Sequence, residues 1–136
     1  MEILVIDAQG GGLGKQIISA VKKKYPETEI TAVGTNSLAT QNMLKGGADH
    51  GATGENAVVV CCRTAKLIIC PIGAVIADSM YGEITPEMAK AIGQSPADRL
   101  LIPMNQCGNI VMGLPRFTVA NAIESVLAYL EHLKQP

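Results

Sequence analysis

The stretch of sequence that decides the fold is Ile6-Asp7-Ala8-Gln9-Gly10-Gly11-Gly12-Leu13-Gly14-Lys15, in which four glycines fall within five positions. The residues before it, 2–6, include an unbroken apolar run, which is typical of a parallel strand buried on both faces. The residues after it place apolar side chains at helical spacing as far as Pro26, which predicts an amphipathic helix. In a strand–turn–helix of this kind, glycine lets an anion approach main-chain N–H groups with no Cβ in the way. The stretch therefore predicts a phosphate-binding turn at a helix N-terminus.

The rest of the chain alternates between predicted strands and helices. Apolar runs predict strands at 29–33, 66–70 and 99–103, with a possible fifth at 110–112. Helices are predicted at 37–44, at 86–92 after an N-capping Thr85, and at 117–134. A further helix is predicted to begin near Glu55, although Val58-Val59-Val60 would also suit a strand. Residues 48–56 are predicted to be a polar loop. The alternation predicts one Rossmann-like domain over residues 1–136, a three-layer α/β/α fold with a mostly parallel sheet of four or five strands.

Composition excludes several classes of protein. The chain has 136 residues, 48% hydrophobic and 17% charged, and this balance is typical of a folded globular protein. A net charge of −1 argues against a nucleic-acid binder that neutralises phosphates, and the basic run Lys22-Lys23-Lys24 is explained by its place at a helix C-terminus. The longest nearly apolar run, 67–77, is interrupted by Pro71 and Gly73 and is shorter than the roughly 20 residues of a membrane span. With no targeting signal visible, we expect a cytoplasmic protein that does not enter a membrane.

The cysteines and histidines give little support for a metal site. Cys61, Cys62, Cys70 and Cys107 form no CxxC pair, and the two histidines, His50 and His132, are far apart. We expect buried free thiols and no metal.

Ligands of open α/β sheets collect at the carboxyl ends of the strands. Here those ends are residues 9–14, 34–37, 71–73 and 104–106, and we expect the four segments to converge. The candidate cofactor-binding residues are Gln9, Gly10, Gly11, Gly12, Leu13, Gly14, Lys15, Thr35, Asn36, Ser37, Pro71, Ile72 and Gly73. Dinucleotide sites commonly place an acid after the second strand for the ribose hydroxyls, whereas this chain has neutral Thr35, Asn36 and Ser37, which would suit a ribose or a 2′-phosphate or merely cap a helix.

The glycine turn matches three known motifs imperfectly. Against G-x-G-x-x-G, Gln9 stands where the first glycine should be. The turn resembles that of short-chain dehydrogenases, but Ala8 replaces the leading glycine and the catalytic Tyr-x-x-x-Lys is missing. It also resembles the deviant Walker A loop of the partition and septum-placement ATPases, but Gln16 stands where that family has a magnesium-binding serine or threonine, and no acid closes the strand at 66–70.

Two further polar groups are candidates for chemistry. Asp78, Ser79, Tyr81 and Glu83 lie in one loop and would supply a general acid, base or hydroxyl-binding group. With no partner base or metal visible, a solvated loop with Asp78 and Glu83 exposed is the favoured interpretation. Asp49 and His50 could act together, although a lone histidine in a polar loop is more often simply exposed.

Four segments together carry a resemblance that extends over nearly the whole chain. They are residues 5–15, the Gly-Thr-Asn-Ser at 34–37, the Gly-Ala-Thr-Gly-Glu-Asn at 51–56, and the stretch from Pro-Ile-Gly at 71–73 to Gly-Glu-Ile-Thr-Pro at 82–86. The chain resembles a family of short bacterial proteins, domain of unknown function 3842. The resemblance implies a Rossmann-like, bacterial, cytoplasmic protein and brings no activity with it.

Three hypotheses follow. The first is a protein that binds a nucleotide or dinucleotide such as NADP or NAD, with its phosphate on the glycine turn and its ribose near Thr35 and Asn36. The second is a non-enzymatic regulatory or assembly protein whose glycine turn is structural. The third is a degenerate deviant Walker A protein that binds ATP. In each case we expect a homo-oligomer.

Overall fold

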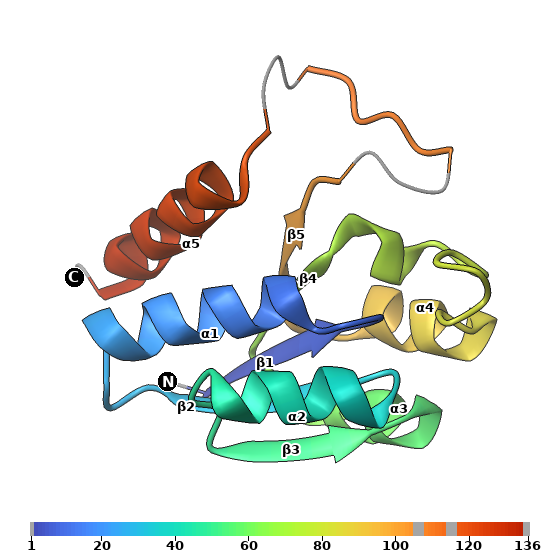
Figure 1. Cartoon of the computed structure of the whole chain (residues 1–136), viewed down its shortest axis with the longest axis horizontal. Helices are drawn as coiled ribbons and strands as arrows, with labels where there is room; N and C mark the ends of the chain where they lie inside the picture. The colour runs from blue at the N-terminus through green and yellow to red at the C-terminus, as the bar shows by residue number, and fades with distance from the viewer. Residues whose placement is uncertain (1, 105–107, 114–116, 135–136) are drawn as a thin grey trace.

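Among the described residues, five parallel strands form one sheet, drawn as arrows in Figure 1. The computed structural model describes residues 2–104, 108–113 and 117–134. The strands are β1 (Glu2–Asp7), β2 (Glu29–Gly34), β3 (His50–Thr53), β4 (Leu67–Pro71) and β5 (Asp98–Ile102). Their order in the sheet is β3-β2-β1-β4-β5, and every neighbouring pair is parallel. This order reverses direction at β1, so the glycine turn that follows β1 lies at the switch point where ligands of such sheets bind.

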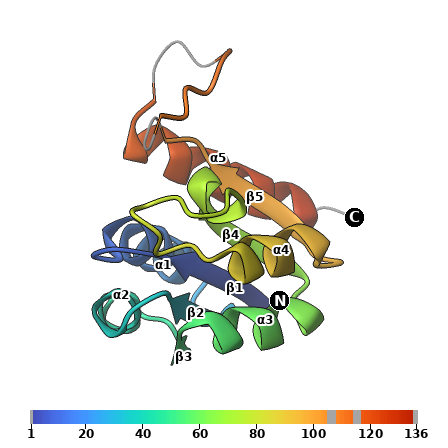
Figure 2. The same cartoon turned by 90° about the vertical axis from the view of Figure 1, so that its right-hand side faces the viewer.

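Helices cover both faces of the sheet, which confirms the Rossmann-like α/β fold. They are α1 (Gly12–Lys24), α2 (Ser37–Lys45), α3 (Glu55–Thr64), α4 (Pro86–Gln94) and α5 (Val119–Lys134), with a short 3-10 helix η1 (Ile72–Val75) after β4. In β1 the side chains of Ile3 and Val5 pack in one core cluster with α1 and α5, while Leu4 and Ile6 pack in the other with α3 and α4. This alternation follows from the two-residue period of a strand. Figure 2 shows α1 and α4 on opposite sides of the strands.

The residues that begin and end the helices agree with those predicted from the sequence. Asn36 accepts the amide hydrogen of Ala39 and caps α2, and Thr85 accepts that of Met88 and caps α4, with Pro86 at the first helical position. Helix α2 ends at Lys45, before Gly46 and Gly47. The basic run Lys22–Lys24 forms the last turn of α1, where cations interact favourably with the helix dipole.

Two predictions of local structure were wrong. Residues 48–56 do not form one polar loop, because His50–Thr53 pairs with β2 as the edge strand β3. This strand is polar and largely exposed, so it carries no apolar run to reveal it. Residues 110–112 form no strand, and the side chain of Ile110 is 76% exposed rather than buried in a sheet. Residues 58–60 lie in the helix α3, so the helix predicted from Glu55 onward is confirmed and the alternative strand is not.

Within the described part of the chain, no helix combines the length and the apolar character that crossing a membrane requires.

Candidate functional site

The glycine turn leads from the end of β1 directly into α1. Gly11 is the N-cap of α1, with φ 71°, and its amide donates to the carbonyl of Ala8 at 3.0 Å. A left-handed backbone at this position strongly favours glycine. Because glycine has no side chain, the N-cap residue cannot accept a hydrogen bond from the first amides of α1. The exposed amides of the first helical turn must therefore find other partners.

One of those partners is Asp7, the last residue of β1. Its Oδ2 accepts the amide hydrogen of Gly14 at 2.7 Å and its Oδ1 accepts that of Ala8 at 2.8 Å, so the carboxylate caps α1 from across the turn. The side chain is buried, and burial raises the pKa of the Asp7 carboxyl above its usual value; the two amide hydrogen bonds oppose this shift and the charge of Glu83 adds to it. The capping role was not predicted from the sequence.

The four glycines of the turn fall into two pairs. A Cβ on Gly11 would lie 2.7 Å from the Cα of Ala39, and a Cβ on Gly14 would lie 2.6 Å from the sulfur of Met43. Gly11 is therefore required by the close approach of the turn to the backbone of α2, and a side chain at position 14 would displace the buried side chain of Met43. A Cβ on Gly10 or Gly12 would meet no atom within 4 Å. Packing within the described chain therefore gives no reason for glycine at positions 10 and 12.

A cavity of about 120 Å³ opens beside this second pair. Its lining comes from the end of β1 and the turn, the end of β4, the loop after η1 and the segment after β5: Asp7, Ala8, Gln9, Gly10, Gly11, Gly12, Leu13, Pro71, Met80 and Met104. The amides of Gly11 and Gly14 have protein partners, but no described residue accepts a hydrogen bond from the amide of Gly10, Gly12 or Leu13. Three main-chain donors at the N-terminus of α1 are thus available at the cavity wall.

The residues after β2 meet the turn through Glu83. The Glu83 Oε1 accepts hydrogen bonds from the amide of Gln9 at 2.8 Å, from Thr35 Oγ1 at 2.7 Å and from Asn36 Nδ2 at 2.7 Å. Burial by itself raises the pKa of the Glu83 carboxyl, but these three hydrogen bonds outweigh burial and hold its pKa below the usual value. The interpretation of the 78–83 loop as solvated was therefore wrong for Glu83, which is half-buried and bound at the end of β2. Ser37, the first residue of α2, is exposed and takes no part in this cluster.

The segment at the end of β4, residues 71–73, was predicted to bind the ligand, but only part of it lines the cavity. Pro71 lies on its wall, whereas Ile72 and Gly73 line a separate space of about 10 Å³ beside it, together with Pro71. Met104 of the fourth segment also contributes, and residues 105–106 lie outside the described part of the chain.

Lys15 is not among the residues that line the cavity, whereas a phosphate-binding lysine would be. Its Cγ lies against Gly46 at the end of α2, where a Cβ on that glycine would come within 3.1 Å of it. The side chain is exposed, and no lysine or arginine is among the cavity-lining residues.

Asp49 and His50 lie away from the cavity, just before and at the start of β3, and each binds a different partner. Asp49 forms an ion pair with Lys22 at 2.7 Å and accepts the amide hydrogen of Ile30, and these contacts lower its pKa. His50 Nε2 lies 2.8 Å from Glu29 Oε1. Asp49 thus connects α1 with β2, and His50 connects β3 with β2. The two side chains bind different partners and do not form an acid–base unit in this structure.

The described cysteines are free thiols, with Cys62 and Cys70 buried and Cys61 half-buried. Burial, with a smaller contribution from Cys61, raises the pKa of the Cys62 thiol to about 11, which favours the neutral thiol over the nucleophilic thiolate. No group of three or more His, Cys, Asp or Glu side chains suited to a metal ion occurs among residues 2–104, 108–113 and 117–134.

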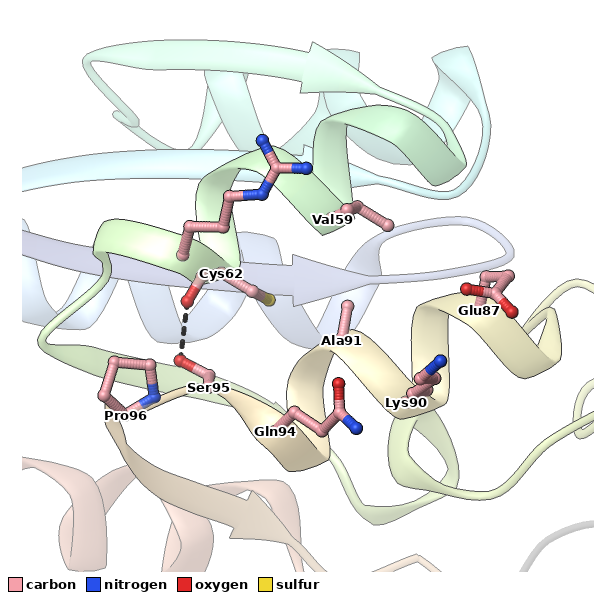
Figure 3. A pocket seen from close by; sticks show the side chains of 9 residues that line it. Val59, Cys62, Glu87, Lys90, Ala91, Gln94, Ser95 and Pro96 are labelled. Atoms are coloured by element: carbon pink, nitrogen blue, oxygen red, sulfur yellow. Dashed lines mark hydrogen bonds between the residues drawn. The ribbon is translucent and has the colours of Figure 1, made fainter.

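Larger hollows lie on the helical faces. One, of about 420 Å³, lies between α3 and α4, with a floor that includes Cys62, Ala91 and Ser95 (Figure 3). The Ser95 hydroxyl donates to the carbonyl of Cys62 at 2.7 Å and so ties the two helix ends together. Arg63 and Lys90 on its rim are exposed. A second, of about 500 Å³, lies between β5 and α5. Neither contains the carboxyl end of β1, where the amide donors are.

Comparison with known proteins identifies the family. Residues 2–135 match the family described as Domain of unknown function (DUF3842), and the chain belongs to this family. A search of curated proteins gave no match. Among solved structures the chain is similar to a dodecameric FMN-dependent UbiX-like decarboxylase from Escherichia coli O157:H7, with 16% identity and a TM-score of 0.48 over 96% of this chain and 76% of the other. At this level of similarity the activity of that enzyme is not carried over.

Proposed function

We propose that this member of the DUF3842 family binds a nucleotide or dinucleotide, with a phosphate group of the ligand on the amides of Gly10, Gly12 and Leu13. The observation that carries the proposal is a pair of glycines, Gly10 and Gly12, on the wall of a cavity. Among the described residues, neither glycine has a packing role and no acceptor binds the amides of Gly10, Gly12 and Leu13. Open space beside a glycine at a helix N-terminus is what a main-chain phosphate site requires.

The size of the cavity limits which part of the ligand it would hold. Sites for whole small molecules measure roughly 300 to 1,000 Å³, and this cavity measures about 120 Å³. It has room for a phosphate group but not for a complete nucleotide. The remainder of the ligand would extend across Gln9 toward Thr35 and Asn36, because Thr35 donates its amide hydrogen to the carbonyl of Asp7 and the ends of β1 and β2 are therefore adjacent.

Charge makes the proposed site one of modest affinity. Asp7 on the cavity wall and Glu83 beside it are acidic, and the lining residues include no cation. Attraction would come from main-chain donors and the helix dipole alone. The same cavity argues against ATP hydrolysis, because Lys15, which a Walker A loop places on the phosphates, is not among its lining residues.

A thermal-shift panel of NADP, NAD and ATP tests the proposal, together with native mass spectrometry of the freshly purified protein for a copurified metabolite. We expect at least one nucleotide to raise the melting temperature of the wild-type chain and Gly12→Asp, which places a carboxylate where the phosphate would lie, to abolish the rise. Gly93→Asp is the matched control, since Gly93 also has open space around it but lies at the far end of α4. A flat response of the wild-type chain to every nucleotide would instead favour the second hypothesis, a regulatory or assembly protein with a structural turn.

A further inference from the structure

The end of β2 has an acidic group that the local sequence does not supply. Residues 34–37 contain no acid, but the Glu83 carboxylate reaches this position from the loop between η1 and α4, 48 residues beyond Thr35. Its Oε1 is held at the same time by Thr35, Asn36 and the amide of Gln9. Gln9 is the residue before Gly10, so this carboxylate borders the proposed phosphate site.

The loop that bears Glu83 is fixed by its own hydrogen bonds. The Asp78 amide donates to the Ile84 carbonyl at 2.7 Å, the Ile84 amide donates to Ser79, and the Ser79 hydroxyl donates to the Gly73 carbonyl. Asp78, Met80 and Tyr81 have φ values of 66°, 57° and 58°, a left-handed backbone that is unfavourable for residues other than glycine. Strained backbone of this kind persists where the surroundings enforce it, and it often occurs at functional sites. The Glu83 carboxylate is therefore positioned before any ligand arrives.

The second oxygen of the carboxylate is available to a ligand. Described residues donate hydrogen bonds to Glu83 Oε1 and none to Oε2. No buried side-chain oxygen or nitrogen among the described residues lacks a partner, so Oε2 must be in contact with solvent. An ionised carboxylate oxygen only accepts hydrogen bonds, which suits hydroxyl groups and opposes a phosphate.

We infer that Glu83 is the specificity-determining residue for the ribose, and that it accepts hydrogen bonds from free 2′- and 3′-hydroxyls through Oε2. This inference rests on the proposed function, since the ribose is placed by the phosphate on the neighbouring turn. It assigns to a distant loop the role that an acid at the end of the second strand plays in dinucleotide sites. The ligand class becomes a ribonucleotide with an unmodified 2′-hydroxyl, such as NAD or ATP, and a 2′-phosphate as in NADP is disfavoured.

Titration calorimetry with two ligand pairs, NAD with NADP and ATP with 2′-deoxy-ATP, tests the inference. For the pair that binds, we expect the wild-type chain to prefer the free 2′-hydroxyl by roughly tenfold or more, the range for a hydrogen bond to a charged group. Glu83→Gln keeps the shape and one oxygen acceptor but removes the charge, and it should remove most of this preference. Glu87→Gln, a carboxylate of the first turn of α4 outside the turn cavity, is the control and should leave the preference unchanged.

The outcomes separate the two proposals. Nucleotide binding without a preference in the wild-type chain, or with a preference that Glu83→Gln leaves intact, would overturn the role of Glu83 and leave phosphate binding standing. Equal strengthening of all ligands by Glu83→Gln would also overturn it, because Glu83 would then act only as a barrier. No binding of any nucleotide to the wild-type chain would overturn the proposed function itself. If Glu83→Gln proves unstable by circular dichroism, the wild-type ratio still tests the inference, because a ratio near one overturns it without any variant.

Discussion

The Asp7 carboxylate accepts the amide hydrogen of Gly14 with an N···O distance of 2.7 Å, and this contact joins the end of β1 to the first turn of α1. It replaces the side-chain cap that Gly11 cannot provide. One acidic residue thus satisfies an amide of the turn, while no residue in the described part of the chain accepts from the amides of Gly10, Gly12 and Leu13. The turn is therefore partly closed by the protein and partly available to a ligand.

Removal of this cap should destabilise the chain. We expect Asp7→Ala to lower the free energy of unfolding by about 1 to 3 kcal/mol, the range for loss of a cap and of a buried acceptor. Urea denaturation monitored by circular dichroism measures the change. Asp98→Ala, at an exposed aspartate of β5, is the control and should stay within about 0.5 kcal/mol of the wild-type chain. Equal changes in the free energy of unfolding for the two substitutions would contradict the capping role of Asp7.

The pKa of Asp7 predicts how its contribution to stability changes with pH. Because burial raises this pKa above the ordinary value of an aspartate, the folded chain holds the proton more tightly than the unfolded chain does. The stability that this proton contributes is complete below the ordinary pKa of an aspartate and is lost as the pH rises through the higher pKa of Asp7 in the folded chain. The free energy of unfolding of the wild-type chain should therefore fall relative to Asp7→Asn over that window, in urea titrations at a series of pH values. A relative rise with pH would mean that the amides of Gly14 and Ala8 outweigh burial.

Gly11 packs closely against α2 whereas its neighbour Gly10 has open space around it, so alanine substitutions at the two positions should differ in their effect on stability. In Gly11→Ala the new Cβ would lie 2.7 Å from both the Cα and the carbonyl oxygen of Ala39, on a residue with φ +71°. We expect a loss of about 2 kcal/mol or more, because left-handed backbone alone costs roughly 1 to 2 kcal/mol. Gly10→Ala meets no atom within 4 Å and should change thermal stability little. If Gly10→Ala were as destabilising as Gly11→Ala, packing would explain both glycines and the case for a ligand would weaken.

Much of the fold was predictable because its signals are local. The apolar run before Asp7, the glycine turn and the helical spacing after Leu13 lie within one short stretch, and they identify β1 and α1 with no long-range information. Caps such as Thr85 with Pro86 are also local. The edge strand β3 escaped detection because edge strands are exposed and this one, His50–Thr53, has no buried residue.

The candidate site was predictable in part. The glycine turn could be identified from its strand and helix, but the separation of Gly11 and Gly14 from Gly10 and Gly12 depends on α2, which packs against only one pair. Glu83 was predicted to be exposed because its hydrogen-bond partners lie 47 to 74 residues away along the chain: Thr35, Asn36 and Gln9. No local pattern encodes such a contact. The one available signal was that the end of β2 has no acid of its own.

The measurement that tests the central claim most directly is an NMR titration of the ¹⁵N-labelled chain with NAD and ATP, following the main-chain amides of the turn. The account predicts that the amide resonances of Gly10, Gly12 and Leu13 shift most, while those of Gly11 and Gly14, already bonded to Ala8 and Asp7, shift less. Largest shifts in the α3–α4 hollow around Arg63 and Lys90, or no shift in the turn at saturating nucleotide, would contradict it.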